Sequence, residues 1–224
     1  MDYQAKEQML LFKCRITSKA FSICILGPDG SGKTTLINSL TEKLKDSGYK
    51  VKYEHFRPKI RQYLNSSVQT PLQITDPHYL PPRHNIISAI KLLGFIIMYY
   101  FDCFINLSKC NKDIKIWDRY IYDVYVDPLR YRLQLPKTLL KLFMFLSPNP
   151  DIVFILDVDP DKLRTRKIEV SAKENERQYY AYKRIAMLVP NSYLINADQD
   201  PLDVLDDTLN LLQRENRIRK NLIL

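Results

Sequence analysis

The chain has 224 residues, of which 46% are hydrophobic and 26% are charged. This composition excludes a largely disordered chain, and the length suits one large α/β domain or two small ones. The formal net charge of +9 is compatible with nucleic acid, an anionic membrane or polyanionic phosphates as ligands.

Residues 1–20 carry several charged side chains around the short apolar cluster Met9–Phe12. They lack the long apolar segment and the small-residue cleavage site of a secretory signal, so we interpret them as an N-terminal extension and expect a cytoplasmic protein. No Gly/Ser linker, repeat or low-complexity tract marks a boundary after them. We therefore expect one domain over residues 21–216, followed by a basic C-terminal tail at 217–224.

Four cysteines are spread along the chain, namely Cys14, Cys24, Cys103 and Cys110. Their spacing is too wide for a CxxC zinc site. We expect reduced thiols in the core.

The first two elements flank the most informative motif. Residues 21–26 form an apolar run that predicts a buried strand, and the apolar spacing from Thr34 to Ser47 predicts a helix that Gly48 ends. Between them, Gly27-Pro28-Asp29-Gly30-Ser31-Gly32-Lys33-Thr34 matches GxxxxGK[ST]. Strand, loop and helix in this order predict a phosphate-binding loop, in which Lys33 reaches the β- and γ-phosphates and the Thr34 hydroxyl binds Mg²⁺.

Residues 50–56 predict a second strand, and a long proline-containing loop follows up to residue 82. The next segment, 86–107, is very apolar and about long enough to span a bilayer. Lys91 and Asp102 interrupt it, and the uninterrupted part suits a helix in a protein core better than a membrane span. We therefore expect a core helix and no transmembrane span.

Strands and helices continue to alternate to the end of the chain. The expected strands are 114–117, 152–156 and 193–195, and the expected helices are 137–146, 160 to about 167, 175–187 and 201–215. Alternation of this kind predicts a mostly parallel sheet with helices on both faces and ligands at the carboxyl ends of the strands.

A second candidate motif, Asp118-Arg119-Tyr120, directly follows the third strand. A carboxylate at this position holds Mg²⁺ in phosphate-loop enzymes, and Arg119 could bind a phosphate through two hydrogen bonds. The alternative is that Asp118 caps the following turn and forms a salt bridge with Arg119. Asp157, at the end of the fourth strand, is a competing metal ligand, although Asp157 or Asp159 could instead cap the helix that Pro160 begins.

A basic segment near the next helix end is a third candidate. It contains Lys162, Arg164, Arg166, Lys167 and Lys173. Phosphoryl transfer needs cations near the γ-phosphate, and a lid over about 164–175 could supply them while excluding water. Arg164 and Arg166 point in different directions on a helix, and we prefer Arg166 as the catalytic arginine. The alternative is that these basic side chains only form a solvated, charged helix face.

These motifs resemble the thymidylate kinase family of P-loop nucleoside monophosphate kinases, over about Phe21 to Leu212. Residues 27–35 resemble its G-x-D-G-x-G-K-[ST]-T loop, Asp118-Arg119-Tyr120 its D-R-[YHS] motif and Phe56-Arg57-Pro58 its R-E-P segment. The resemblance implies a three-layer P-loop NTPase fold with a five-stranded parallel sheet, Mg²⁺-dependent transfer from ATP to a small phosphorylated acceptor, and often a homodimer.

The resemblance also assigns roles to residues. The expected ATP-binding residues are Gly27, Pro28, Asp29, Gly30, Ser31, Gly32, Lys33, Thr34 and Thr35, and the acceptor-binding residues are Asp29, Arg57, Asp118, Arg119 and Tyr120. The expected catalytic residues are Lys33, Arg119 and Arg166, and the metal ligands are Thr34 and Asp118.

The chain departs from the family pattern at several positions. Gly30 stands where some members carry an arginine, which leaves the catalytic cation to the lid. On the acceptor side, Lys59 replaces the acid of R-E-P, and the family's base-recognising stretch is not visible in 121–128. Residues that could line an altered acceptor pocket are Tyr122, Asp123, Asp127, Arg130, His84 and Arg83. The leading prediction is conversion of dTMP to dTDP, and the alternative is a kinase of the same fold for a sugar or glycan end.

Two classes other than a small-molecule kinase are disfavoured. A nucleotide switch would carry an [NT]KxD motif after a strand, whereas Asn111-Lys112-Asp113 precedes one. A nucleic-acid ATPase would carry a basic stripe interleaved with aromatic residues, so we expect no nucleic-acid partner.

Overall fold

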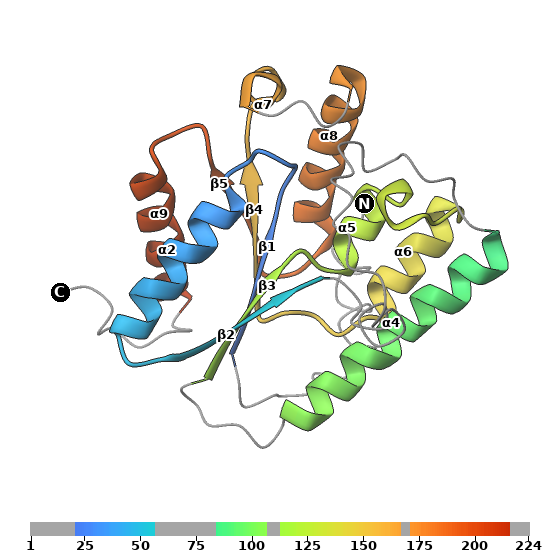
Figure 1. Cartoon of the computed structure of the whole chain (residues 1–224), viewed down its shortest axis with the longest axis horizontal. Coiled ribbons are helices and arrows are strands. Elements are labelled where there is room, and N and C mark those ends of the chain that lie inside the picture. The colour runs from blue at the N-terminus through green and yellow to red at the C-terminus, as the bar shows by residue number, and fades with distance from the viewer. Residues whose placement is uncertain (1–20, 57–83, 107–112, 167–170, 216–224) are drawn as a thin grey trace, which may run out of the picture.

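The fold is an α/β arrangement of three layers, as the sequence predicts. The structure, a computed structural model, describes residues 21–56, 84–106, 113–166 and 171–215. Its sheet has five strands in the order β2-β3-β1-β4-β5, and every neighbouring pair is parallel. Figure 1 shows helices on both faces of this sheet.

The strands lie within two residues of their predicted bounds. They are β1 (Phe21–Leu26), β2 (Lys50–His55), β3 (Asp113–Asp118), β4 (Ile152–Asp157) and β5 (Ser192–Asn196). In the central strand β1, Ile23 and Ile25 belong to one hydrophobic cluster, whereas Cys24 and Leu26 belong to the other. Because both faces of β1 are buried, the strand reads as a continuous apolar run instead of an alternating one.

The helices divide into two layers. On one side, α2 (Lys33–Asp46) packs against α9 (Pro201–Arg214). The other side holds α4 (Asn85–Asn106), α5 (Ile121–Val126), α6 (Lys137–Leu146) and α8 (Ala172–Leu188), as Figure 1 shows. A seventh helix, α7 (Pro160–Arg166), follows β4. The short helix α5 and the 3₁₀ turn η1 (Leu129–Tyr131) are not among the elements that the sequence predicts.

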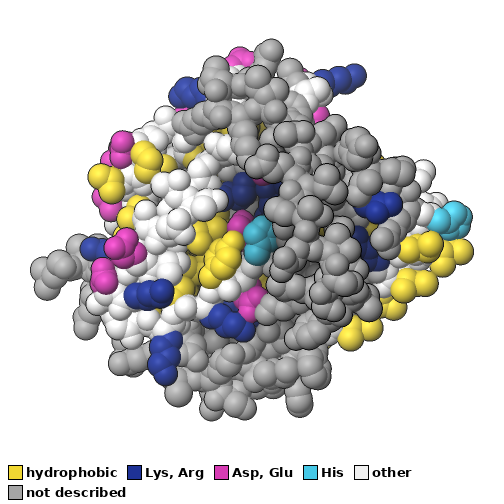
Figure 2. All heavy atoms as spheres, in the orientation of Figure 1, with side chains coloured by type: hydrophobic (Ala, Val, Ile, Leu, Met, Phe, Trp, Pro, Cys, Tyr) yellow, Lys and Arg dark blue, Asp and Glu magenta, His cyan; other side chains and the backbone are white. Residues whose placement is uncertain are grey.

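The long apolar helix α4 is buried on one face only. Leu92, Phe95 and Tyr99 pack into the core, but Ile90 on the opposite face is 65% exposed and Ile97 is 60% exposed. Hydrophobic side chains line this edge of the molecule in Figure 2. The prediction of a core helix therefore holds for one face of α4, whereas the opposite face is exposed. None of the helices in the described ranges combines the length and the apolar character that a bilayer span needs.

One polar contact joins the amino ends of the two central strands. The backbone N–H and the hydroxyl of Ser22 donate to Asp151 Oδ2 over 2.8 and 2.7 Å. The Asp151 N–H in turn donates to Ser22 Oγ over 3.0 Å. These bonds lie where β1 and β4 begin to pair, so they fix the relative position of the two strands.

Replacing Asp151 should therefore destabilise the fold. We expect Asp151→Ala to lower the free energy of unfolding by about 1–3 kcal/mol, because the partly buried Ser22 donors lose a charged acceptor. Urea denaturation measures the difference. Asp206→Ala removes the same charge from an exposed position on α9 and should change stability by less than about 0.5 kcal/mol. Equal stability of the two variants would contradict the role given to this contact.

Candidate active site

At two positions of the loop after β1, the backbone has a conformation that favours glycine. Gly27 has φ of 150°, and a Cβ there would lie 2.7 Å from Ser31 Oγ and 3.1 Å from Leu156 Cβ. Gly32 has φ of 89° and is the N-cap residue of α2. The loop therefore ends at a helix N-terminus, where backbone N–H groups and the helix dipole favour an anion.

Lys33, the first residue of α2, is folded back onto this loop. Its ammonium group donates to the carbonyl oxygens of Gly27 and Pro28 over 2.8 and 2.6 Å. Burial, reinforced by the charge of Arg119, lowers the pKa of Lys33 to about 8. A phosphate bound in the loop would stabilise the charged ammonium and so oppose this shift.

Asp118 and Thr34 are the predicted Mg²⁺ ligands beside the loop. Asp118 ends β3, and its Oδ2 accepts a hydrogen bond from the Tyr53 hydroxyl over 2.9 Å, with His55 Nε2 at 3.7 Å. The other oxygen, Oδ1, is buried and has no hydrogen-bond partner in the part of the chain that the structure describes. The Thr34 side chain at the start of α2 is exposed. Mg²⁺ prefers oxygen ligands and takes one or two from a protein when phosphates supply others. Asp118 and Thr34 fit that requirement.

Arg119 connects the end of β3 with the phosphate loop. Its backbone N–H donates to Ile25 O of β1 over 3.1 Å, and its φ of 69° is left-handed, a strained conformation for a side-chain-bearing residue. Its guanidinium donates to Asp123 Oδ2 over 2.6 Å and also to Asp29 Oδ1. Arg119 thus pairs with these two acids, and the alternative of a salt bridge with Asp118 is not what the structure has.

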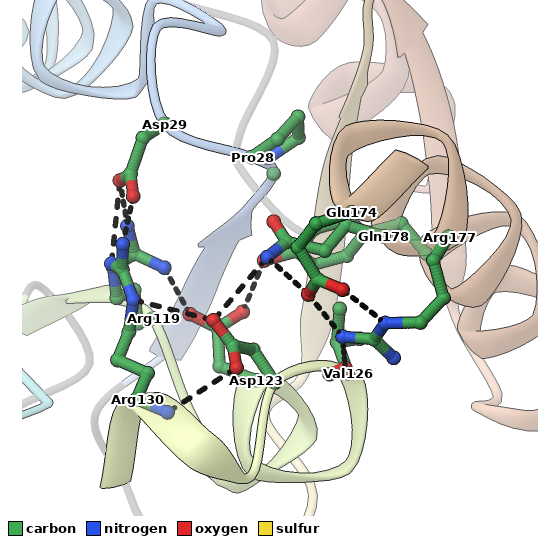
Figure 3. Close-up of polar contacts among 12 residues, drawn as sticks. Pro28, Asp29, Arg119, Asp123, Val126, Arg130, Glu174, Arg177 and Gln178 are labelled. Atoms are coloured by element: carbon green, nitrogen blue, oxygen red, sulfur yellow. Dashed lines mark hydrogen bonds and ion pairs between the residues drawn. The ribbon is translucent and has the colours of Figure 1, made fainter. Parts of the chain in front are cut away.

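A second arginine reaches the same carboxylate. Arg130 of η1 forms an ion pair with Asp29 Oδ2, and its Nη1 lies 3.4 Å from Asp29 Oδ1. Figure 3 shows Asp29 pointing from the loop toward both guanidiniums. Burial and the Arg119 charge act to lower the pKa of Arg130, but Asp29 raises it above its ordinary value. The sequence marks Arg130 only as a possible pocket residue and does not pair it with Asp29.

The acids that pair with the two arginines are themselves held by side chains of α8. Asp123 is 1% exposed and accepts a hydrogen bond from the Tyr182 hydroxyl of α8 over 2.8 Å. Asp127 lies 3.6 Å from Arg130 Nε and accepts from the Gln178 side chain over 3.3 Å. Burial acts to lower the pKa of Arg119, but Asp123 and the other neighbours raise it above its ordinary value, so the guanidinium stays charged.

The other expected site residues lie elsewhere or outside the described part. Tyr120 packs among Tyr99, Trp117 and Tyr122, and its hydroxyl donates to Pro148 O over 2.7 Å. It is thus part of the aromatic core. Arg57, Arg83 and Lys167 lie outside the described residues, as do the side chains of Arg164 and Arg166 on α7.

The acids near β4 have partners of their own. Asp157 forms an ion pair with Lys183 at 3.5 Å. Asp159 accepts a hydrogen bond from the Asp161 N–H over 2.8 Å at the start of α7, so it caps this helix as the sequence alternative has it. Lys162 lies 3.6 Å from Asp198.

The fold and the site together define a phosphotransferase of the P-loop class. The chain matches no family model. It is 26% identical over 214 residues to probable thymidylate kinase 1 of Saccharolobus solfataricus, covering 86% of this chain and 96% of the relative. A probable thymidylate kinase of Archaeoglobus fulgidus is 25% identical over 88% of this chain and 92% of its own length. A thymidylate kinase of an Exiguobacterium species is 26% identical over 86% of this chain and 95% of its own length. The chain is thus similar to thymidylate kinases over most of its length.

The lowered pKa of Lys33 predicts that binding of a triphosphate takes up protons. With a pKa of about 8, the free amine is partly neutral at pH 8 and above, and bound phosphates would raise that pKa, so binding protonates the amine. Calorimetry with ATP and Mg²⁺ near pH 8.5, in buffers of different ionisation enthalpy, measures the uptake.

Lys33→Arg is the matched control for this experiment. An arginine stays charged at this pH, so the variant should bind ATP without taking up protons from Lys33. Uptake of the same size in the variant would assign the proton to another group. Absence of uptake in the parent protein would contradict the lowered pKa.

Proposed function

We propose that this protein is an ATP- and Mg²⁺-dependent nucleoside monophosphate kinase that converts dTMP to dTDP. The contact between Asp29 and Arg119 is the observation that carries the proposal. In this contact Arg119, which follows β3 and is the proposed acceptor-binding residue, meets Asp29 of the loop after β1. Two anionic substrates bound at these two points would lie side by side, as transfer between them requires. The three thymidylate kinase relatives support nucleotides as substrates.

On this proposal the residues of the loop bind the donor. The backbone N–H groups of residues 27–35 and the N-terminus of α2 surround the ATP phosphates, and Lys33 moves from the loop carbonyls to the β- and γ-phosphates. Thr34 and Asp118, the latter directly or through water, would hold Mg²⁺. When bound, Mg²⁺ neutralises charge on the phosphates of the donor.

The transfer is a direct in-line displacement. An oxygen of the acceptor phosphate forms a bond to the γ-phosphorus while the bond from that phosphorus to the β–γ bridging oxygen breaks, and ADP leaves with the electron pair. Arg119 holds the acceptor, and Asp123 and Tyr182 fix its orientation before substrates bind. Positioned charge of this kind accounts for most of the rate in phosphoryl transfer. We further propose that Arg166 is the cation that the lid supplies and that Arg57 also contacts the acceptor. The proposed assembly is a homodimer.

An ADP-release assay with a panel of acceptors tests the proposal. We expect turnover with dTMP or another nucleoside monophosphate and little with sugars that lack a phosphate. Lys33→Ala should lower kcat by about a thousandfold or more, because the γ-phosphate loses its main side-chain cation. Lys137→Ala, at an exposed lysine of α6, should leave turnover unchanged. Tight binding of ATP without ADP release on any monophosphate would refute the kinase assignment.

A separate prediction distinguishes the two candidate metal ligands. Asp118→Asn keeps the shape of the side chain but removes its charge, so the Mg²⁺ concentration that gives half-maximal activity should rise about tenfold or more. Asp157→Asn removes a charge from the end of β4, where Lys183 is its partner, and should leave the Mg²⁺ requirement near that of the parent. The opposite result would make Asp157 the metal ligand.

A further inference from the structure

A buried arginine and a half-buried one converge on one carboxylate at the edge of the phosphate loop. The side chains of Arg119 and Arg130 are 10% and 20% exposed, and that of Asp29, which both contact, is 22% exposed. Figure 3 shows the two guanidiniums on the same side of Asp29. At this point two positive charges face a single negative one. We call Arg119 and Arg130 together the arginine pair.

Each arginine is held by a second acid that lies away from Asp29. For Arg119 this acid is Asp123, at 2.6 Å. For Arg130 it is Asp127, which accepts from the Arg130 backbone N–H over 3.2 Å and lies 3.6 Å from its Nε. Asp127 is 5% exposed. Arg119 thus binds Asp123 through Nη1 and Asp29 through Nη2. Arg130 has Asp127 near its Nε, and both of its Nη groups face Asp29. Such a pair is preorganised to bind an anion that offers two or more oxygens.

Partial burial of the cluster makes a purely stabilising role a weak explanation. Ion pairs removed from water lose hydration that their attraction only partly offsets, and they often add little stability. One arginine would already neutralise Asp29. The second adds another set of forked donors beside Asp29, which suits a ligand that offers more oxygens and more charge than one carboxylate.

We propose that Arg130 is a second acceptor-binding residue, which with Arg119 binds the phosphate group of the acceptor in place of the Asp29 carboxylate. A phosphate monoester carries a charge of about −1.5 to −2 at pH 7, so it competes favourably with a single carboxylate for the arginine pair. The inference rests on the proposed kinase function and adds Arg130 to the residues that bind the phosphate of its acceptor. A sugar without a phosphate would leave both arginines paired with Asp29.

Steady-state kinetics of Arg130→Gln with dTMP as the probe tests this inference. The KM for dTMP should rise about ten- to a hundredfold, because a charge-assisted pair of hydrogen bonds is lost. The kcat and the Kd for ATP with Mg²⁺ should change less than about twofold. Arg130→Lys keeps the charge without the forked geometry and should give an intermediate KM. Arg184→Gln, at an exposed position of α8, is the matched control and should behave like the parent protein.

The competing explanation is that Arg130 only orders the phosphate loop through Asp29. In that case Arg130→Gln would weaken ATP binding and lower the Tm while the KM for dTMP stayed unchanged, and this result would overturn the inference. The lysine variant keeps the test decisive if the glutamine variant does not fold.

A second measurement separates this inference from the kinase proposal. If the parent protein transfers no phosphoryl group to any acceptor, the kinase proposal fails, and binding is then tested by itself. The protein is saturated with Mg²⁺ and a non-hydrolysable ATP analogue, and inorganic phosphate is added. A phosphate-dependent rise in Tm that Arg130→Gln abolishes supports the arginine pair as an anion site. A rise of equal size in both proteins, or no rise in the parent, overturns it.

Discussion

The active-site arrangement depends on compensation of buried charge around Arg119. This guanidinium is almost fully buried, and its charge is balanced by Asp29 of the phosphate loop and Asp123 of α5. Removing Arg119 would take this cation away from the buried Asp123 carboxylate, and a buried unpaired charge is expensive, whereas Asp29 would keep Arg130. The loop, the end of β3 and the start of α5 therefore hold one another in position. The parallel register puts Ile25 opposite Asp118, so the residues that follow both strands meet at one edge of the sheet.

Sequence motifs predict the parts of this site but not how the parts are joined. Lys33, Asp118 and Arg119 are found from local patterns, since a glycine-rich loop after an apolar run and an acid at a strand end each have a physical signature. The link between Asp29 and Arg119 joins residues 90 positions apart. It follows from strand order and register, which no local pattern specifies. Tyr120 is predicted from its place in the motif as an acceptor contact, and the motif does not indicate that its ring packs among other aromatic side chains.

The segment from Ile121 to Tyr131 was the hardest to predict, and it is where the chain departs from the family pattern. Helix α5 has six residues, too few for a helical period to show, and most of them are buried, so no polar face marks it. Arg130 follows Asp127-Pro128, and Asp127 accepts a hydrogen bond from its backbone N–H. An aspartate before a proline signals a turn of this kind. It does not indicate that the arginine of that turn reaches the phosphate loop.

The opposite pKa shifts of Lys33 and Arg119 follow from the same arrangement. Burial disfavours both charges, and for Lys33 it prevails, with the Arg119 charge adding to it, so the pKa falls to about 8. For Arg119 the facing acids prevail and the pKa rises. Lys33 and Arg119 therefore lie close enough for the charge of one to disfavour the charge of the other. An anion at the loop and another at the arginines would each reduce the repulsion that the other cation feels. Binding of donor and acceptor should therefore be mutually favourable through the protein, even though the two substrates repel each other directly.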